Sequence, residues 1–355
     1  MNGVETDWDD IVYQTGLQQD YTVSLSNRKE DFSYYWSMGY ADREGVKVGD
    51  RYRNLRTRLN LESKVTSFLT VGLNAQFATR LGGYLAADVE QREHNSPFTT
   101  NDIDILDSPY RMSPSGDNNT KNPFFDNLYR DRRDIHHDLN ANLYAIVKLP
   151  FGFEYQMNFT PRYHWYEYMN HESAEHPEWA GDGGRSERKN EKTFNWQVDN
   201  ILRWKKEFGE DHRVEATFLQ NAEKGQWWKT VAQNKLYSPS DILGFHNIGA
   251  GTAPSVSSED TYKTGDALMG RLFYSFKDKY MLTASVRRDG YSAFGSMNPH
   301  AVFPAVALGW VFTSEKFMEK TSDWLNYGKL RFSWGQNCNR DIGQYEALAQ
   351  LNSGA

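Results

Sequence analysis

Apolar and polar residues alternate one by one along most of this chain, in segments separated by short turns or longer polar stretches. In residues 21–25 the odd-numbered positions are Tyr, Val and Leu and the even-numbered ones carry hydroxyl groups. Because side chains of a β-strand point alternately to its two faces, this period of two predicts strands with one apolar and one polar face. The pattern recurs often enough to predict roughly twelve strands. These include residues 32–40, 53–63, 67–80, 139–147, 153–159, 194–204, 214–218, 272–276, 280–286, 306–312 and a strand beginning at 330.

Two kinds of connection alternate between these segments. Short turns are expected near residues 28–31, 64–67, 149–152, 207–211 and 277–279, and long loops near 43–50, 82–133, 168–191, 221–265 and 288–303. The order predicts an antiparallel meander with tight turns at one end and large loops at the other. Loops of this length are uncommon in compact soluble domains unless they are functional.

The length and chemistry of the strands favour a membrane barrel. A strand of about ten residues rises roughly 33 Å, or about 23 Å along the membrane normal when tilted by 45°. Aromatic residues such as Phe194 and Trp204, or Tyr274 and Tyr280, stand near the ends of the apolar faces, as in the aromatic girdles of such barrels. We therefore predict an all-β, antiparallel transmembrane β-barrel with short periplasmic turns and long extracellular loops. A soluble β-sandwich would also alternate, and it remains the alternative.

Composition excludes several classes of partner and site. Aromatic residues make up 15% of the 355 residues although the mean hydropathy is -0.76 and the net charge is -7. The negative charge argues against a nucleic-acid partner. The single cysteine, Cys338, excludes an internal disulfide and a cysteine-based zinc site. The polar, acidic first residues are not a signal peptide, so an exported protein would begin further upstream.

Four aromatic residues in the expected long loops are candidates for ligand binding: Tyr110, Trp179, Trp227 and Trp228. Exposed aromatic rings stack on sugars or pack against partner proteins, and they also form small loop cores. The sequence leaves these readings open.

A charged cluster leaves one of the last strands. Arg287 and Asp289 are two residues apart, so both side chains should point into the lumen of the barrel. We expect structural ion pairs on the barrel wall, with direct contact to a substrate as the alternative.

No catalytic constellation stands out, and neither a cofactor nor a metal is indicated. Cys338 has no histidine nearby in the sequence that would activate it as a nucleophile. His136 and His164 lack the regular spacing of metal ligands and are interpreted as rim residues.

Residues 279–310 read KYMLTASVRRDGYSAFGSMNPHAVFPAVALGW, and residues 332–345 read FSWGQNCNRDIGQY. Together they resemble the barrel of the SusC/RagA family of TonB-linked outer-membrane proteins, the TonB-dependent receptors. Residues 6–27 and 34–46 resemble the first barrel segments of that family. Tyr291 and Cys338 depart from its pattern. The matching positions are Arg287, Arg288, Asp289, Gly290, Phe294, Gly295, Phe303, Pro304, Gly309, Trp310, Gly335, Gln336 and Asn339.

The resemblance implies an importer of glycan or peptide fragments in the outer membrane of a Gram-negative bacterium, embedded in outer-membrane lipid. It implies a SusD-like surface lipoprotein as a lid and TonB as the source of energy. Such barrels close at about 22 strands, so residues 1–355 are expected to be part of the barrel domain, an internal fragment. The signal peptide, N-terminal extension, TonB box, plug and C-terminal strands would be absent.

Two other classes of function are kept as alternatives. A soluble or surface carbohydrate-binding β module would use the loop tryptophans and fold without detergent. A polysaccharide hydrolase would need two inward carboxylates at catalytic spacing.

Overall fold

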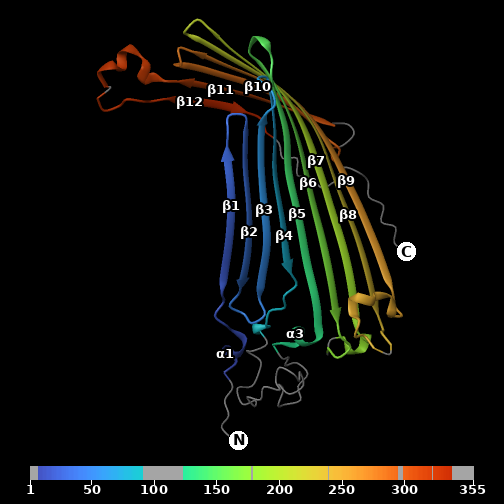
Figure 1. Cartoon of the computed structure of the whole chain (residues 1–355). Helices are drawn as coiled ribbons and strands as arrows, with labels where there is room; N and C mark the ends of the chain where they lie inside the picture. The colour runs from blue at the N-terminus through green and yellow to red at the C-terminus, as the bar shows by residue number, and fades with distance from the viewer. Residues whose placement is uncertain are drawn as a thin grey trace.

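The computed structural model describes residues 7–90, 123–176, 179–238, 240–294, 299–321 and 323–337. Within them one antiparallel sheet holds 12 strands in sequence order, each paired with its neighbours along the chain (Figure 1). This confirms the predicted all-β meander. The strands are β1 (Gln18–Arg28), β2 (Phe32–Glu44), β3 (Arg51–Lys64), β4 (Leu69–Gly82), β5 (Arg130–Lys148), β6 (Phe153–Glu172), β7 (Arg185–Phe208), β8 (His212–Lys235), β9 (Ser255–Phe276), β10 (Tyr280–Tyr291), β11 (His300–Trp310) and β12 (Leu330–Gly335).

Helical structure in the described residues is confined to short pieces within the connections. The α-helices are α1 (Trp8–Val12) and α3 (Phe125–Tyr129), and the 3-10 helices are η3 (Pro150–Gly152), η4 (Ala180–Asp182), η5 (Gly244–Ala250), η6 (Phe312–Ser314) and η7 (Lys316–Thr321). None of the helices in this part of the chain is long and apolar enough to cross a membrane.

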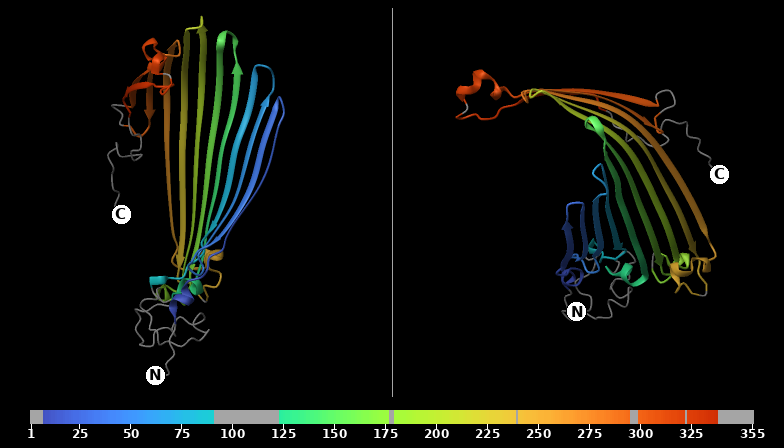
Figure 2. Two further views of the ribbon diagram at one scale, coloured as in Figure 1. Left: turned by 90° about the vertical axis from the view of Figure 1, so that its left-hand side faces the viewer. Right: turned by 45° about the horizontal axis from the view of Figure 1, so that its top comes forward.

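The sheet curves without closing. Figure 2 shows an open trough whose blue edge, β1, and red edge, β12, lie far apart. A strand inside a bilayer must pair its backbone groups, because lipid supplies no hydrogen bonds. Both edge strands therefore need partner strands in a membrane.

The two ends of the sheet differ as predicted, with one exception. Connections at one end comprise residues 45–50, 83–129, 173–184, 236–254 and 292–299, while the other end has mostly three- or four-residue turns (Figure 1). The exception is the segment 311–329 between β11 and β12, which holds η6 and η7. Its Glu315 accepts hydrogen bonds from Tyr280 Oη (2.5 Å), Trp310 Nε1 (3.1 Å) and Lys279 Nζ (3.2 Å) and so fastens the segment to the sheet.

The central strands are much longer than predicted. β7 and β8 have 24 residues each, and β6 and β9 have 20 and 22. At about 3.3 Å per residue, β7 extends roughly 80 Å, well over twice the length that a membrane requires. The expected long loops at 168–191 and 221–265 are thus largely strand, and the true connections are 173–184 and 236–254.

Large apolar side chains remain exposed rather than forming a central core. Val23 and Leu25 are 65% and 56% exposed, and Leu272 and Leu308 are 47% and 51% exposed. A soluble sandwich would cover this face with a second sheet, and the described residues form a single sheet. The small cluster of Val12, Ala87 and Phe124 holds α1 against the long connections at the loop end.

Candidate functional site: the polar face of the sheet

The pairing between strands sorts the side chains into two faces. Leu202 pairs with Phe218 in one row across β7 and β8, and Gln197 pairs with Glu223 in another. Residues of the same face differ by an even number along each strand, so these two rows lie on opposite sides. We call the side of Leu202 the apolar face and the side of Gln197 the polar face.

Aromatic residues border the apolar face. On β7, Trp204 lies near the short turns and packs on Phe153 at 6.2 Å between ring centroids, while Phe194 lies ten residues away and packs on Tyr163 at 5.3 Å. At about 33 Å of strand, tilted in the sheet, this spacing fits the hydrocarbon thickness of a bilayer. The apolar face therefore has the dimensions of a lipid-facing band.

Three polar side chains lie within this apolar band and hydrogen-bond to one another. Tyr155 Oη donates to Asn200 Oδ1 at 2.6 Å, and Asn200 Nδ2 donates to Gln220 Oε1 at 2.7 Å. All three side chains lie on the apolar face, in adjacent strands. Polar groups facing lipid are stabilised when they hydrogen-bond with each other.

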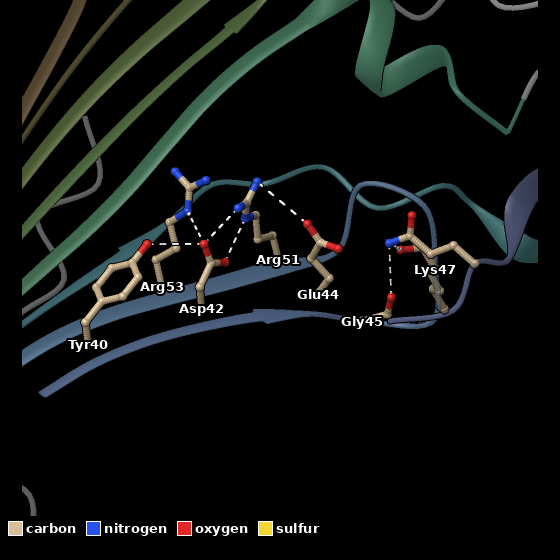
Figure 3. A network of polar contacts seen from close by, with 8 residues as sticks. Tyr40, Asp42, Glu44, Gly45, Lys47, Arg51 and Arg53 are labelled. Carbon is tan, nitrogen blue, oxygen red and sulfur yellow. Dashed lines mark hydrogen bonds and ion pairs between the residues drawn. The ribbon is translucent and has the colours of Figure 1, made fainter. Parts of the chain in front are cut away.

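Past Tyr40, the apolar face becomes charged. Asp42 accepts a bidentate pair of bonds from Arg51, at 2.8 Å from Nε and 2.7 Å from Nη2, and further bonds from Arg53 Nε (3.3 Å) and Tyr40 Oη (3.1 Å) (Figure 3). Arg51 also lies 3.9 Å from Glu44. The network joins β2 to β3 at the loop end, and it marks where the apolar band gives way to water.

The polar face carries a patch of ring-bearing and charged side chains on β5, β6 and β7. His136 stacks on Tyr166 at 4.4 Å between ring centroids and lies 5.4 Å from His164. Lys189 Nζ lies 4.8 Å from the Tyr166 ring and 5.3 Å from the Tyr168 ring. Since both faces of Tyr166 are occupied, this patch stiffens the wall and presents mainly its polar edges.

The predicted loop tryptophans lie in three different settings. Trp227 and Trp228 belong to β8 and not to a loop, which corrects their expected position. Trp227 is on the polar face, whereas Trp228 is on the other face, opposite Lys192. Only Trp179 lies in a connection, where Arg185 covers its ring at 4.9 Å.

Arg287 and Asp289 share the polar face of β10, as predicted. Arg287 Nε donates to Asp289 Oδ1 at 2.7 Å, and Asp289 is 7% exposed. Arg288, between them, is on the opposite face and pairs with Asp266 at 3.2 Å. The ion pair is thus formed within the wall; contact with a substrate stays a prediction.

A polar hollow of about 250 Å³ lies on the polar face near the middle of β6–β9. Its floor is at Gly225, which is buried and lies under the side chains of Asn195 and Lys263. Arg162 and Lys263 line the hollow from β6 and β9, the outer two of these four strands. Amide and carboxylate groups also line it, from Asn195, Gln197 and Glu223, and the remaining lining residues are Thr160, Trp196, Lys224 and Thr264.

A partly buried ion network holds together the rim of the wall, by which we mean the loop end of the sheet. Arg130 bonds Glu172 at 2.5 Å through Nη2 and Asp126 at 2.8 Å through Nη1. His176 Nε2 lies 3.3 Å from Asp126 Oδ1, and this hydrogen bond, followed by the Arg130 charge, lowers the pKa of Asp126. The network joins α3 and the start of β5 to the end of β6 and the connection after it.

Two residues singled out from the sequence, Tyr110 and Cys338, lie outside the described residues. Among the residues that are described, no group of three or more histidine, cysteine, aspartate or glutamate side chains is arranged to hold a metal ion.

The hollow was not predicted from the sequence, because Arg162 and Lys263 fall outside the predicted strands 153–159 and 272–276. A signal was nevertheless present. Thr160, Arg162 and His164 continue the even-numbered polar positions of β6, so the period of two runs beyond the apolar segment.

Comparison with known proteins identifies the family of this chain. Residues 84–353 match the family model described as "TonB dependent receptor-like, beta-barrel". The chain belongs to this family. It is accordingly a barrel segment of a Gram-negative outer-membrane receptor.

Individual relatives of the chain are also named as TonB-dependent receptors. The chain is 26% identical over 360 residues to TonB-dependent receptor P39 of Formosa agariphila, covering 98% of this chain and 33% of that protein. It is 25% identical over 392 residues to TonB-dependent receptor SusC of Bacteroides thetaiotaomicron, covering 98% and 36%. The chain thus spans about a third of the length of these relatives, which are named as receptors and not as enzymes.

Solved structures show the same fold. The RagAB peptide importer in its open-open state superposes with a TM-score of 0.83 at 21% identity, covering 99% of this chain and 40% of that one. The ferric citrate transporter FecA gives 0.52 at 9% identity, covering 85% and 40%. The predicted resemblance to the SusC/RagA barrel is confirmed.

Proposed function

We propose that residues 1–355 form part of the wall and rim of an importer that carries glycan or peptide fragments through the outer membrane. The observation that carries the proposal is the division of one sheet into an apolar and a polar face, with the polar face continuing past the apolar band. In a barrel, the apolar face meets lipid and the polar face lines the lumen.

The long polar ends of β6–β9 support a role in capture. They extend the wall beyond the band, and buried networks such as Arg130 with Glu172 hold their rim. A rigid rim is a suitable seat for a SusD-like lipoprotein that closes over the ligand. The relative named SusC and the importer described as RagAB are the basis for this partner.

Transport would further require a plug inside the lumen and a TonB-binding segment, through which TonB would supply the energy. The polar face offers the plug hydrogen-bonding and charged side chains, including the Arg287–Asp289 pair. We assign these residues to the wall and not to a catalytic centre.

The test is uptake by living cells. Cells that express the full-length protein are given fluorescent mixtures of oligosaccharides and of peptides, with and without functional TonB. The proposal predicts accumulation of one class that stops when TonB is removed. Accumulation of neither class, in cells where the protein is present in the outer membrane, would refute it.

A further inference from the structure

The hollow over Gly225 has the chemistry of a site for an acidic sugar. We propose that it binds one uronic-acid residue of an oligosaccharide during import, with Arg162 and Lys263 holding the carboxylate and Trp227 stacking on a sugar ring. This inference rests on the proposed import function and specifies its substrate class.

Two positively charged side chains in the hollow have no carboxylate partner in the described part of the chain and could hold the carboxylate of a sugar. Arg162 and Lys263 are both exposed on the polar face, line the same hollow from β6 and β9, and form no ion pair with a described residue. Several other arginines of the wall do have carboxylate partners, such as Arg203 with Glu154 at 3.1 Å. Basic residues outnumber Glu223, the one carboxylate among the described lining residues, and this balance suits a carboxylate ligand.

The floor is the second argument. A Cβ atom at Gly225 would lie 2.5 Å from Asn195 Oδ1 and 3.3 Å from two carbons of Lys263. Glycine therefore lets the Asn195 and Lys263 side chains lie directly against the backbone of β8 at the floor of the hollow. Asn195 and Gln197 then offer donors and acceptors that match sugar hydroxyls.

Trp227 is the third argument. It follows Gly225 by two residues on the same face of β8, at about 7 Å along the strand. Its indole Nε1 donates to Glu191 Oε2 at 3.3 Å, which fixes the ring beside the hollow. An aromatic ring next to a polar cavity is the usual arrangement for a sugar, whose C–H groups pack on the ring while its hydroxyls form hydrogen bonds.

A peptide fits the hollow less well. Peptides bind to sheets mainly by adding a strand to an open edge, together with apolar pockets for side chains. Here β6–β9 are paired on both sides, so their backbone groups are already used. The lining is polar and offers no apolar pocket.

The experiment is calorimetric titration of the full-length protein in detergent with tetragalacturonate. Arg162→Gln and Lys263→Gln should each weaken binding about 10-fold or more, because each removes a charge-assisted hydrogen bond. Trp227→Ala should weaken it to a similar extent, and Trp227→Phe should retain most of the affinity. The matched controls are Trp228→Ala and Lys192→Gln, a cross-strand pair on the opposite face of the sheet, which should change binding less than about twofold.

Two further ligands test whether the site prefers an acidic sugar: maltotetraose is a neutral sugar, and tetraglutamate is an acidic peptide. The proposal requires tetragalacturonate to bind at least about 10-fold more tightly than either. Equal binding of maltotetraose, preferential binding of tetraglutamate, or full affinity in Arg162→Gln and Lys263→Gln would overturn it. Unchanged TonB-dependent uptake in these variants would overturn the sugar site and leave the importer intact, whereas loss of all uptake from wild-type cells would refute the importer itself.

Discussion

Trp227 and Trp228 are adjacent in the sequence but lie on opposite sides of the sheet. Trp227 Nε1 donates to Glu191 Oε2 at 3.3 Å on the polar face, while Trp228 is paired with Lys192 on the other face. Glu191 and Lys192 on β7 lie on opposite faces in the same way. Two adjacent residues therefore face different surroundings, and a substitution of one can be controlled by the same kind of substitution of the other.

Glu191→Ala should lower the free energy of unfolding by about 1 kcal/mol, since the Trp227 indole loses its acceptor. Lys192→Ala should change it by less than about 0.5 kcal/mol. Urea unfolding of the full-length protein in lipid vesicles measures both. Equal effects of the two substitutions would contradict the assignment of faces.

Arg287→Ala should destabilise the barrel by about 3 kcal/mol, because the buried Asp289 carboxylate would lose its cation. Asp289→Ala should cost less, as the freed Arg287 side chain is 38% exposed and reaches water. In the double variant the two losses should not add, which a double-mutant cycle of unfolding energies detects. Strict additivity would show that the ion pair contributes nothing.

Tyr155→Phe should lower stability by about 1 kcal/mol, because Asn200 Oδ1 would lose a donor within the lipid-facing band. Combining Asn200→Leu with Gln220→Leu in the Tyr155→Phe background should be neutral or stabilising, because all three polar side chains would then be replaced by apolar groups. Heat-dependent migration in gels, with unfolding in vesicles, compares the variants. Strong destabilisation by the double leucine variant would indicate that this region does not face lipid.

The rim should loosen in acid. The pKa of Asp126 is lowered by the hydrogen bond to His176 and by Arg130, so its contribution is complete above its ordinary value of 3.8. That contribution is lost as the pH falls through the lower pKa of the folded state. Amide hydrogen exchange in α3 should therefore rise only below pH 3.8.

His176→Ala removes the largest cause of this shift, so exchange in α3 should rise at a higher pH than in the wild type. His212→Ala, at the short-turn end, provides the control and should leave α3 unchanged. An identical pH profile in His176→Ala would show that the rim network does not depend on this bond.

The sequence predicted the meander, the two faces and the family, because the period of two is strong where one face is apolar. It placed Arg287 and Asp289 on one face for the same reason. Strand ends were harder to predict. From Glu187 to Lys192 on β7 both faces are polar, so alternation cannot be distinguished from a polar loop. The same holds from Glu223 to Gln226 on β8, and Trp227 was therefore assigned to a loop.

The hollow depends on residues far apart in the chain. Arg162 and Lys263 belong to β6 and β9, and only the pairing of four strands brings them to one cavity. The period of two gives the face of each residue but not the register between distant strands. The segment 311–329 was unexpected because its anchor, Glu315, acts through tertiary hydrogen bonds.

The most direct test of the account compares the two faces at adjacent positions. Spin labels are attached to Thr217→Cys and Phe218→Cys in the full-length protein, after its native cysteines, Cys338 among them, are replaced by serine, and the protein is placed in vesicles. The account predicts that the label at 218 collides with oxygen dissolved in lipid and that the label at 217 does not. Equal exposure of both labels to a water-soluble nickel reagent, or the reverse pattern, would contradict the claim that the apolar face meets the membrane.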